Sequence, residues 1–504
     1  MYKLKTKVRT FALYTRLFIF ILQFVCNLLI PDHDPGVFTW VIDPSLKPTV
    51  LDRILSFLFD GLLRWDAQHF LHIATHGYTF ETNIAFFPLY PLIVRTFANL
   101  LYWMQEEYAI ISFITAVKLS AVSLNLGFFL LASDAFYELS RKVLKDEYLA
   151  YKAGLFFAIN PGSIFFTAGY SESLNSMLTF YSLYKISKNL SAKTCVGVLL
   201  ASATRSNSIL NAGFILYNSL KIVATETIIY VRLKKACREK AELSTTIANI
   251  IGDAIIPGLF NLLGCVAPFF LFQWYCYTHF CRLTKQTPGA VIILPYPTPI
   301  YRCSNNPPIS YSYIQSVYWG NGLFAYWEIK QVPNFTLAIP VLAIVLVTSY
   351  NFIWFHWDYV KRLGLVDNNL LGIPRKPILA VRQYRVLPRE CFVYIVHASF
   401  LALFAIFFMN VQVATRLIFS ASPLVPWLAA MMTTRWDKPA VPLCEDDNPE
   451  ILLKVECKSN LESNTDSILF QEKIDTELGR WIMMYFLGYF LIGTILFCNN
   501  LPWT

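Results

Sequence analysis

The segment 64–76 gathers ionisable and aromatic side chains, and it holds the best candidate for proton transfer. It begins Arg-Trp-Asp-Ala-Gln-His-Phe at Arg64. A carboxylate near apolar walls has a pKa shifted towards neutrality, so Asp66 could act as a general base towards a hydroxyl group. Two other interpretations stay open, in which Asp66 pairs with Arg64 or caps a helix over 67–76.

Three histidines follow on one expected helix face, because His69, His72 and His76 are three and four residues apart. Two histidines at such a spacing can bind zinc. However, the chain has no HExxH motif and no obvious further ligand. We therefore expect polar residues on a wet interfacial face and no metal site.

Three more charged residues lie near predicted helix ends. Glu172 stands in GYSES, Arg205 in ATRSN and Arg416 in QVATR. The arginines could hold a phosphate group through charge-assisted hydrogen bonds, and Glu172 could bind sugar hydroxyls. The alternatives are a helix cap at Glu172 and arginines that extend to lipid headgroups. Two arginines on the same face as a carboxylate favour a site. The chain has no P-loop, GxGxxG or GxSxG motif.

The composition places these residues in a membrane protein. The 504 residues are 56% hydrophobic and 15% charged, whereas soluble domains carry roughly 25% charged residues. The apolar runs are long and do not alternate, which predicts helices in a bilayer. We expect an all-α, polytopic transmembrane bundle that forms a single domain over 1–504. The net charge of +9 lies in short basic segments beside apolar runs, which is typical of topology signals and not of nucleic-acid binding.

The hydropathy pattern predicts roughly eleven spans of about 20 residues each. They lie near 11–30, 109–131, 150–166, 174–190, 194–210, 211–229, 246–278, 335–357, 391–410, 412–432 and 479–498. A further apolar segment, 84–104, contains Pro88, Pro91 and Arg95. If it does not cross, the basic loops all face the cytosol, as the positive-inside rule requires. We therefore interpret 84–104 as re-entrant or interfacial, with the N-terminus in and the C-terminus out.

This topology brings several segments to the outer face. They are the first loop 31–83, the turns near 167–173 and 203–212, the aromatic and proline-rich loop 279–334, and the junction near 410–416. Within the first loop, the apolar residues of 51–64 fall on one helical face, which predicts an amphipathic helix on the membrane surface. The acidic loop 433–478 is expected in the cytosol.

Six sequence blocks together resemble one known family. They are RWDAQHF at 64–70, AFFPLYP at 85–91, NPGSIFFTAGYSESL at 160–174, ATRSN at 203–207, YWGNGLFAYWEIKQVPNF at 318–335 and NVQVATRLIFSASP at 410–423. In this order they are similar to the GPI mannosyltransferase II (phosphatidylinositol-glycan class V) family, over nearly the whole chain. The acidic loop 433–478 matches no block of the family.

The resemblance implies a GT-C-type glycosyltransferase of the endoplasmic reticulum membrane with a luminal site. The donor would be dolichol phosphate mannose, with no cofactor. The acceptor would be the mono-mannosylated glucosaminyl-phosphatidylinositol precursor of GPI anchors, which gains a second mannose in α-1,6 linkage with inversion. In some lineages the family acts with a small membrane subunit.

Roles for individual residues follow from this resemblance. Asp66 would be the base, while Arg205 and Arg416 would stabilise the phosphate. Arg64, His69 and Glu172 would orient the acceptor glycan. The remaining residues predicted to bind substrate are Trp65 and Asn207.

Other functions remain open from the sequence. A transporter or scramblase would also explain the helices, but it predicts inverted repeats and charges near the membrane midplane. A protein O-mannosyltransferase would share the donor and accept Ser or Thr, and a non-catalytic subunit would tolerate loss of Asp66. The sequence does not decide whether Cys281 and Cys303 form a disulfide. The sequons at Asn189 and Asn334 are predicted to be unglycosylated.

Overall fold

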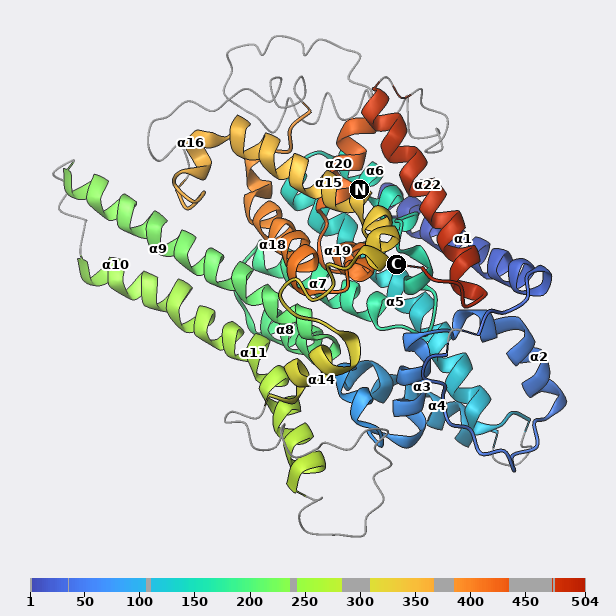
Figure 1. The fold of residues 1–504 in the computed structure, drawn as a ribbon. Coiled ribbons are helices and arrows are strands. Elements are labelled where there is room, and N and C mark those ends of the chain that lie inside the picture. The colour runs from blue at the N-terminus through green and yellow to red at the C-terminus, as the bar shows by residue number, and fades with distance from the viewer. Residues whose placement is uncertain are drawn as a thin grey trace.

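The computed structural model describes residues 2–34, 36–105, 110–235, 243–282, 309–366, 385–434, 474 and 476–503. Every regular element within these ranges is a helix (Figure 1). The predicted all-α class is therefore confirmed. Most of the loop 433–478 and the stretch 283–308 lie outside the described residues.

Among the described residues, seven helical stretches are long and apolar enough to cross a membrane. They include α1 (Tyr2–Leu29), α5 (Phe113–Leu144), α9 (Asn211–Lys235), α11 (Ile256–Tyr277), α15 (Val332–Phe355), α18 (Phe392–Phe408) and α22 (Glu477–Cys498). The stretch that contains α11 starts earlier, because α10 (Leu243–Asn249) runs into it through a π-helical turn. An eighth span exists if α19 (Ala414–Ala421) and α20 (Leu424–Thr433), which are bent by 80°, count as one broken span.

The predicted count of eleven spans is not confirmed, because three predicted spans form short helices. The segments near 150–166, 174–190 and 194–210 give α6 (Glu147–Ala158), α7 (Glu172–Ile186) and α8 (Ala192–Thr204), with 12, 15 and 13 residues. At about 1.5 Å per residue they are shorter than a hydrocarbon core of about 30 Å. Ten of the 12 residues of α6 and 11 of the 15 residues of α7 are buried inside the protein. Their apolar character therefore reflects burial against other helices, which hydropathy cannot distinguish from contact with lipid.

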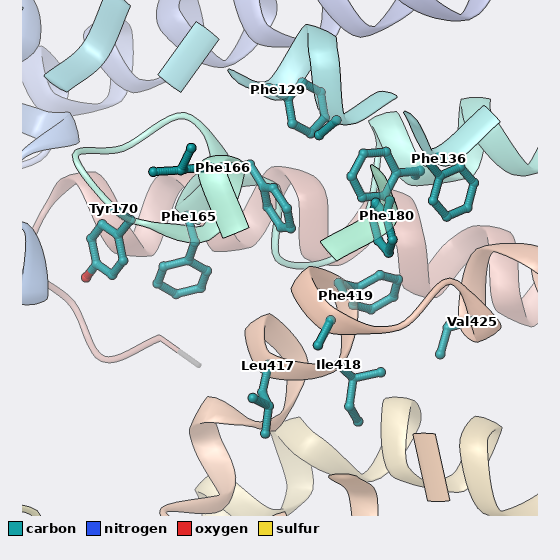
Figure 2. Close-up of a cluster of buried hydrophobic side chains, with 14 of the residues drawn as sticks. Phe129, Phe136, Phe165, Phe166, Tyr170, Phe180, Leu417, Ile418, Phe419 and Val425 are labelled. Atoms are coloured by element: carbon teal, nitrogen blue, oxygen red, sulfur yellow. The ribbon is translucent and has the colours of Figure 1, made fainter. Parts of the chain in front are cut away.

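Aromatic rings from α5, α6 and α7 form the centre of this packing. Phe136 of α5 stacks on Phe157 of α6 with ring centroids 4.8 Å apart, and it meets Phe180 of α7 edge to face at 5.2 Å. Figure 2 shows Phe136 and Phe180 above Phe419 of α19. Such pairs add to the energy of apolar burial, so the short helices are held by side-chain packing.

The first loop and the segment that follows it form three helices that are not among the candidate spans. They are α2 (Val50–Phe59), α3 (Asp66–His76) and α4 (Leu89–Trp103). Thr49 caps α2 in a capping box with Asp52, and Asp52 also accepts a hydrogen bond from the backbone of Ser112 at the start of α5. Apolar side chains of α2, such as Phe57, are exposed, as expected for an interfacial helix. The segment 84–104 gives the 15-residue α4, which is not among the candidate spans.

The two ends of the bundle bring together different segments of the chain. At one end, basic side chains contact several elements: Lys5 pairs with Glu138, Lys145 pairs with Glu390, and Lys152 donates to the carbonyl of Thr433. The other end brings together the start of α3, the start of α7, the end of α8, the start of α19 and the end of α22. Four of the segments that the topology assigned to the outer face therefore meet.

A glycine fixes the distance between α1 and α6. A Cβ atom on Gly154 would lie 2.9 Å from Cγ1 of Val8, which is fully buried. We expect Gly154→Ala to destabilise the protein by about 1–3 kcal/mol, because the extra methyl group overpacks this contact. The thermal midpoint of the detergent-solubilised protein measures the change. The matched control is Gly127→Ala on α5, where nothing lies within 4 Å of the added Cβ. Equal midpoints for the two variants would refute the packing argument.

Candidate active site

Asp66 is the first residue of α3 and follows a strained turn. Trp65 has φ 56° and ψ −127°, which is costly for a residue with a Cβ atom. The backbone N–H of Asp66 donates to the hydroxyl of Tyr170 at 3.0 Å, and that hydroxyl donates to the carbonyl of Arg64 at 3.4 Å. Tyr170 therefore holds the turn that presents the Asp66 carboxylate.

A buried arginine in α1 supports the turn that carries Tyr170 and Glu172. The guanidinium of Arg16 donates to the carbonyls of Ala158 and Ser163, both at 2.8 Å. It also lies over the ring of Phe129 at 4.0 Å. These carbonyls end α6 and begin the connection to α7, where helix geometry leaves them without a backbone partner. Arg16 thus fixes the break between α6 and α7.

Four charged side chains form a continuous chain of ion pairs. Nη1 of Arg416 lies 2.7 Å from Oδ2 of Asp66 and 3.9 Å from Oε1 of Glu172. Glu172 in turn pairs directly with Arg205. The order is Asp66, Arg416, Glu172, Arg205, and the formal charges cancel. The side chain of Glu172, between the two arginines, is only 1% exposed.

The ion pair with Arg416 sets the protonation of Asp66. Burial raises the pKa of this carboxyl group. The charge and hydrogen bond of Arg416 outweigh that effect, so the net pKa lies below its ordinary value. The pKa shift towards neutrality that the sequence suggested is therefore wrong. The prediction considered the apolar residues near Asp66 in the sequence. It could not include Arg416, which is 350 residues away.

The four charges line a cavity of about 120 Å³. The other described residues that line it are uncharged, and most are aromatic or carry amide or hydroxyl groups. They include Tyr170, Gln315, Trp319, Asn321 and Asn410. A cavity with convergent polar groups among apolar walls is the usual form of a small-molecule site. The charged side could hold a phosphate next to a hydroxyl group.

Arg64 and His69 lie outside this cavity and act on its surroundings. Arg64 pairs with Asp32 at 2.5 Å and reaches the carbonyl of Cys498, so the interpretation in which it pairs with Asp66 is wrong. The ring of His69 stacks between those of Phe38 and Phe86, with centroid distances of 4.1 and 4.6 Å. Burial lowers the pKa of His69, although the charge of Asp66 and the hydrogen bond that Nδ1–H of His69 donates to Oδ1 of Asn83 oppose this.

Trp65 and Asn207 also lie outside the cavity lining. The indole N–H of Trp65 and the amide nitrogen of Asn207 are buried, and neither has a partner within the described residues. The other two histidines bond locally, His72 to the Thr79 hydroxyl at 2.7 Å and His76 to the Val41 carbonyl at 3.0 Å. In the described part of the chain, no three His, Cys, Asp or Glu residues are placed to hold a metal.

Sequence reasoning missed the uncharged residues of the cavity. Tyr170 stands in the same stretch as Glu172, while Trp319 and Asn321 belong to the block at 318–335 and Asn410 begins the block at 410–423. The sequence blocks that resemble the family therefore include these cavity residues. Nothing in an isolated Trp or Asn indicates which one faces a cavity, so the residues could not be selected.

Comparisons with known proteins identify the family of this chain. The model of the family described as mannosyltransferase (PIG-V) matches residues 5–504. The chain belongs to the PIG-V mannosyltransferase family. It is 33% identical to GPI alpha-1,6-mannosyltransferase 2 of Rattus norvegicus, over 99% of this chain and 98% of that protein. The Homo sapiens protein of the same name is also 33% identical, over 99% of each chain. The protein named GPI mannosyltransferase 2 of Drosophila melanogaster is 26% identical, again over 99% of each chain.

Glu172 is buried between two arginines, so we expect it to contribute to the stability of this PIG-V family member. We expect Glu172→Gln to lower the free energy of unfolding by about 3 kcal/mol, because Arg205 loses its partner in a buried site. Thermal unfolding of the solubilised protein measures this loss. The matched control is Glu328→Gln, since Glu328 forms an exposed pair with Lys330 that should contribute at most about 1 kcal/mol. A loss no larger than that of the control would contradict the buried network.

Proposed function

We propose that this chain transfers the second mannose, in α-1,6 linkage, to the mono-mannosylated glucosaminyl-phosphatidylinositol precursor of GPI anchors. The proposed donor is dolichol phosphate mannose. The observation that carries the proposal is the ion-pair chain, which places a carboxylate beside two arginines at one cavity. The names of the relatives, over nearly the whole chain, support the linkage and the acceptor.

The chemistry is a single displacement at the anomeric carbon of the donor. The 6-hydroxyl oxygen of the acceptor mannose forms the new C–O bond, and its proton passes to Asp66. The bond from the anomeric carbon to the phosphate oxygen breaks, and its electron pair leaves with dolichyl phosphate. The donor is β-linked and the product α-linked, so one inversion suffices and no covalent enzyme intermediate forms. No cofactor takes part.

Arg416 interacts in turn with the base, Asp66, and with the leaving phosphate. The phosphate gains one negative charge as it leaves, and Asp66 loses one as it accepts the proton. Arg416 contacts Asp66 at 2.7 Å, so its charge becomes available as Asp66 is neutralised. A fixed cation aimed at developing negative charge stabilises a transition state. Glu172 holds Arg205 beside the same cavity, as a second donor to the phosphate.

The remaining predicted residues act as positioning groups in this scheme. Arg64 ties the start of α3 to the end of α22 through the carbonyl of Cys498. His69 packs α3 against Phe38 and Phe86. Neither needs to touch the acceptor glycan, which changes the roles that the resemblance implied for them.

Two features support a luminal position of the cavity in the endoplasmic reticulum. The basic side chains Lys5, Lys145 and Lys152 gather at the opposite end of the bundle, as expected for a cytosolic face. Cys281, at the end of the helical stretch that contains α11, is disulfide-bonded, and disulfides persist on the oxidising side. Cys303 lies outside the described residues.

Substitution of Asp66 tests the assignment of the base. We expect Asp66→Asn to lower transfer by at least about 100-fold, because a general base contributes that much or more. The measurement is the lipid profile of cells in which this protein is the only second mannosyltransferase, supplemented with the small membrane subunit where the host lacks one. The variant should accumulate the mono-mannosylated precursor at normal protein abundance.

The control for this substitution is Asp134→Asn, which breaks a similar pair with Arg9 at the opposite end of the bundle and should leave transfer intact. If Asp66→Asn restores the second mannose, the base lies elsewhere. If wild-type protein transfers mannose to peptides and not to the lipid, the acceptor assignment is wrong.

The lowered pKa of Asp66 predicts the acid side of the pH profile. Asp66 must be ionised to accept a proton, and Arg416 holds its pKa below the ordinary value, which is about 3.9. We therefore expect the transfer rate of the solubilised enzyme to stay flat from neutral pH down to about pH 5. A fall in rate with a midpoint between about pH 6 and 7 would indicate a different titrating group.

A further inference from the structure

One part of the cavity wall contains no charged side chain among its described residues. It is formed by α14 (Ser310–Trp319), the loop that follows it, and the junction after α18. Gln315 and Trp319 are one helical turn apart on α14, so both face the same side. Asn321 and Asn410 complete this amide–aromatic wall, which is defined by these four residues.

Hydrogen bonds hold the amides of this wall in fixed positions. The amide nitrogen of Asn321 donates to Oε1 of Gln315 at 2.6 Å, and its Oδ1 accepts from the backbone N–H of Asn410 at 2.9 Å. The N–H of Phe324 also donates to the carbonyl of Phe407 at 2.7 Å. Two hydrogen bonds therefore join the loop after α14 to the end of α18 and the residue pair that follows it.

The side-chain oxygen of Asn410 is an unused acceptor. It is buried and has no partner within the described residues, although Asn410 lines the cavity. Buried polar atoms are nearly always hydrogen-bonded, so an unpaired one in a cavity wall calls for an explanation. A ligand that donates a hydroxyl hydrogen would satisfy it.

Trp319 provides a fixed aromatic surface in the same wall. Its ring lies 6.0 Å from that of Phe86 and 6.2 Å from that of His69, measured between centroids. α14 itself is tied down by Tyr318, whose hydroxyl donates to Oε2 of Glu81 at 3.0 Å. His69, which lies outside the cavity, therefore packs near a tryptophan that lines it.

This combination of groups suits one class of ligand. A pyranose ring presents an apolar C–H face, which fits an aromatic surface, and a rim of hydroxyl groups, which fit neutral amides. A phosphate would instead be drawn to Arg205 and Arg416, which line another part of the cavity. The two walls thus divide the substrates by their charge.

We propose that Gln315, Trp319, Asn321 and Asn410 form a saccharide subsite that binds the neutral sugar of the acceptor and directs its hydroxyl towards Asp66. This assignment rests on the proposed mannosyl transfer. It makes the amide–aromatic wall the determinant of acceptor affinity, with the donor held mainly by the arginines.

Separate titration of the two substrates tests this subsite. We expect Trp319→Ala and Gln315→Leu to raise KM for a synthetic mannosyl-glucosaminyl-phosphatidylinositol acceptor by about 10-fold, with KM for a short-chain polyprenyl phosphate mannose donor unchanged. Trp319→Phe, which keeps an aromatic surface, should restore most of the acceptor affinity. The matched control is Trp274→Ala, because Trp274 is 65% exposed on α11 and does not line the cavity.

The outcomes separate the subsite from the proposed function. If Trp319→Ala or Gln315→Leu has a higher donor KM, or a lower kcat at unchanged acceptor KM, the proposed saccharide subsite is refuted. If the Trp319→Ala protein does not accumulate in cells, the acceptor KM and donor KM of Gln315→Leu decide in the same way. Competitive inhibition of the wild type by the soluble mannosyl-glucosamine disaccharide, weakened in Gln315→Leu, is expected. Wild-type protein that transfers no mannose in this assay would refute the proposed function itself.

Discussion

The arrangement of the bundle depends on one constraint, which is that buried charges must be paired. Glu172 is almost fully buried, and its partners Arg205 and Arg416 come from helices far apart in the sequence. Breaking such a pair is costly, so the start of α7, the end of α8 and the start of α19 have to meet at one place. Asp66 then joins them through Arg416. α7 begins and α8 ends at this cavity, and both are shorter than α5 and α11, against which they respectively pack.

The sequence predicts the fold class and the charged half of the site. Long apolar runs specify a helical membrane protein, and the distribution of Lys and Arg assigns Asp66, Glu172, Arg205 and Arg416 to one face. The structure brings these four together. This prediction succeeds because charged residues in an apolar chain are rare, so each one is conspicuous.

The remaining features depend on contacts that a single sequence does not encode locally. Asp66 and Arg416 are 350 residues apart, so neither the pair nor its effect on the pKa of Asp66 could be read from the sequence around Asp66. The lengths of α6, α7 and α8 were overestimated because an apolar helix within a protein resembles one in lipid. Trp319 and Asn410 were overlooked because neutral side chains of their kind are common throughout this chain.

The cancellation of charge within the ion-pair chain has a consequence for how substrates arrive. Two carboxylates and two guanidinium groups leave no net field that extends beyond the cavity, so an anionic lipid experiences little long-range attraction. The encounter then relies on lateral diffusion within the bilayer, and recognition begins only at contact. Capture should accordingly depend weakly on ionic strength, in contrast to proteins that collect anions with an open basic surface.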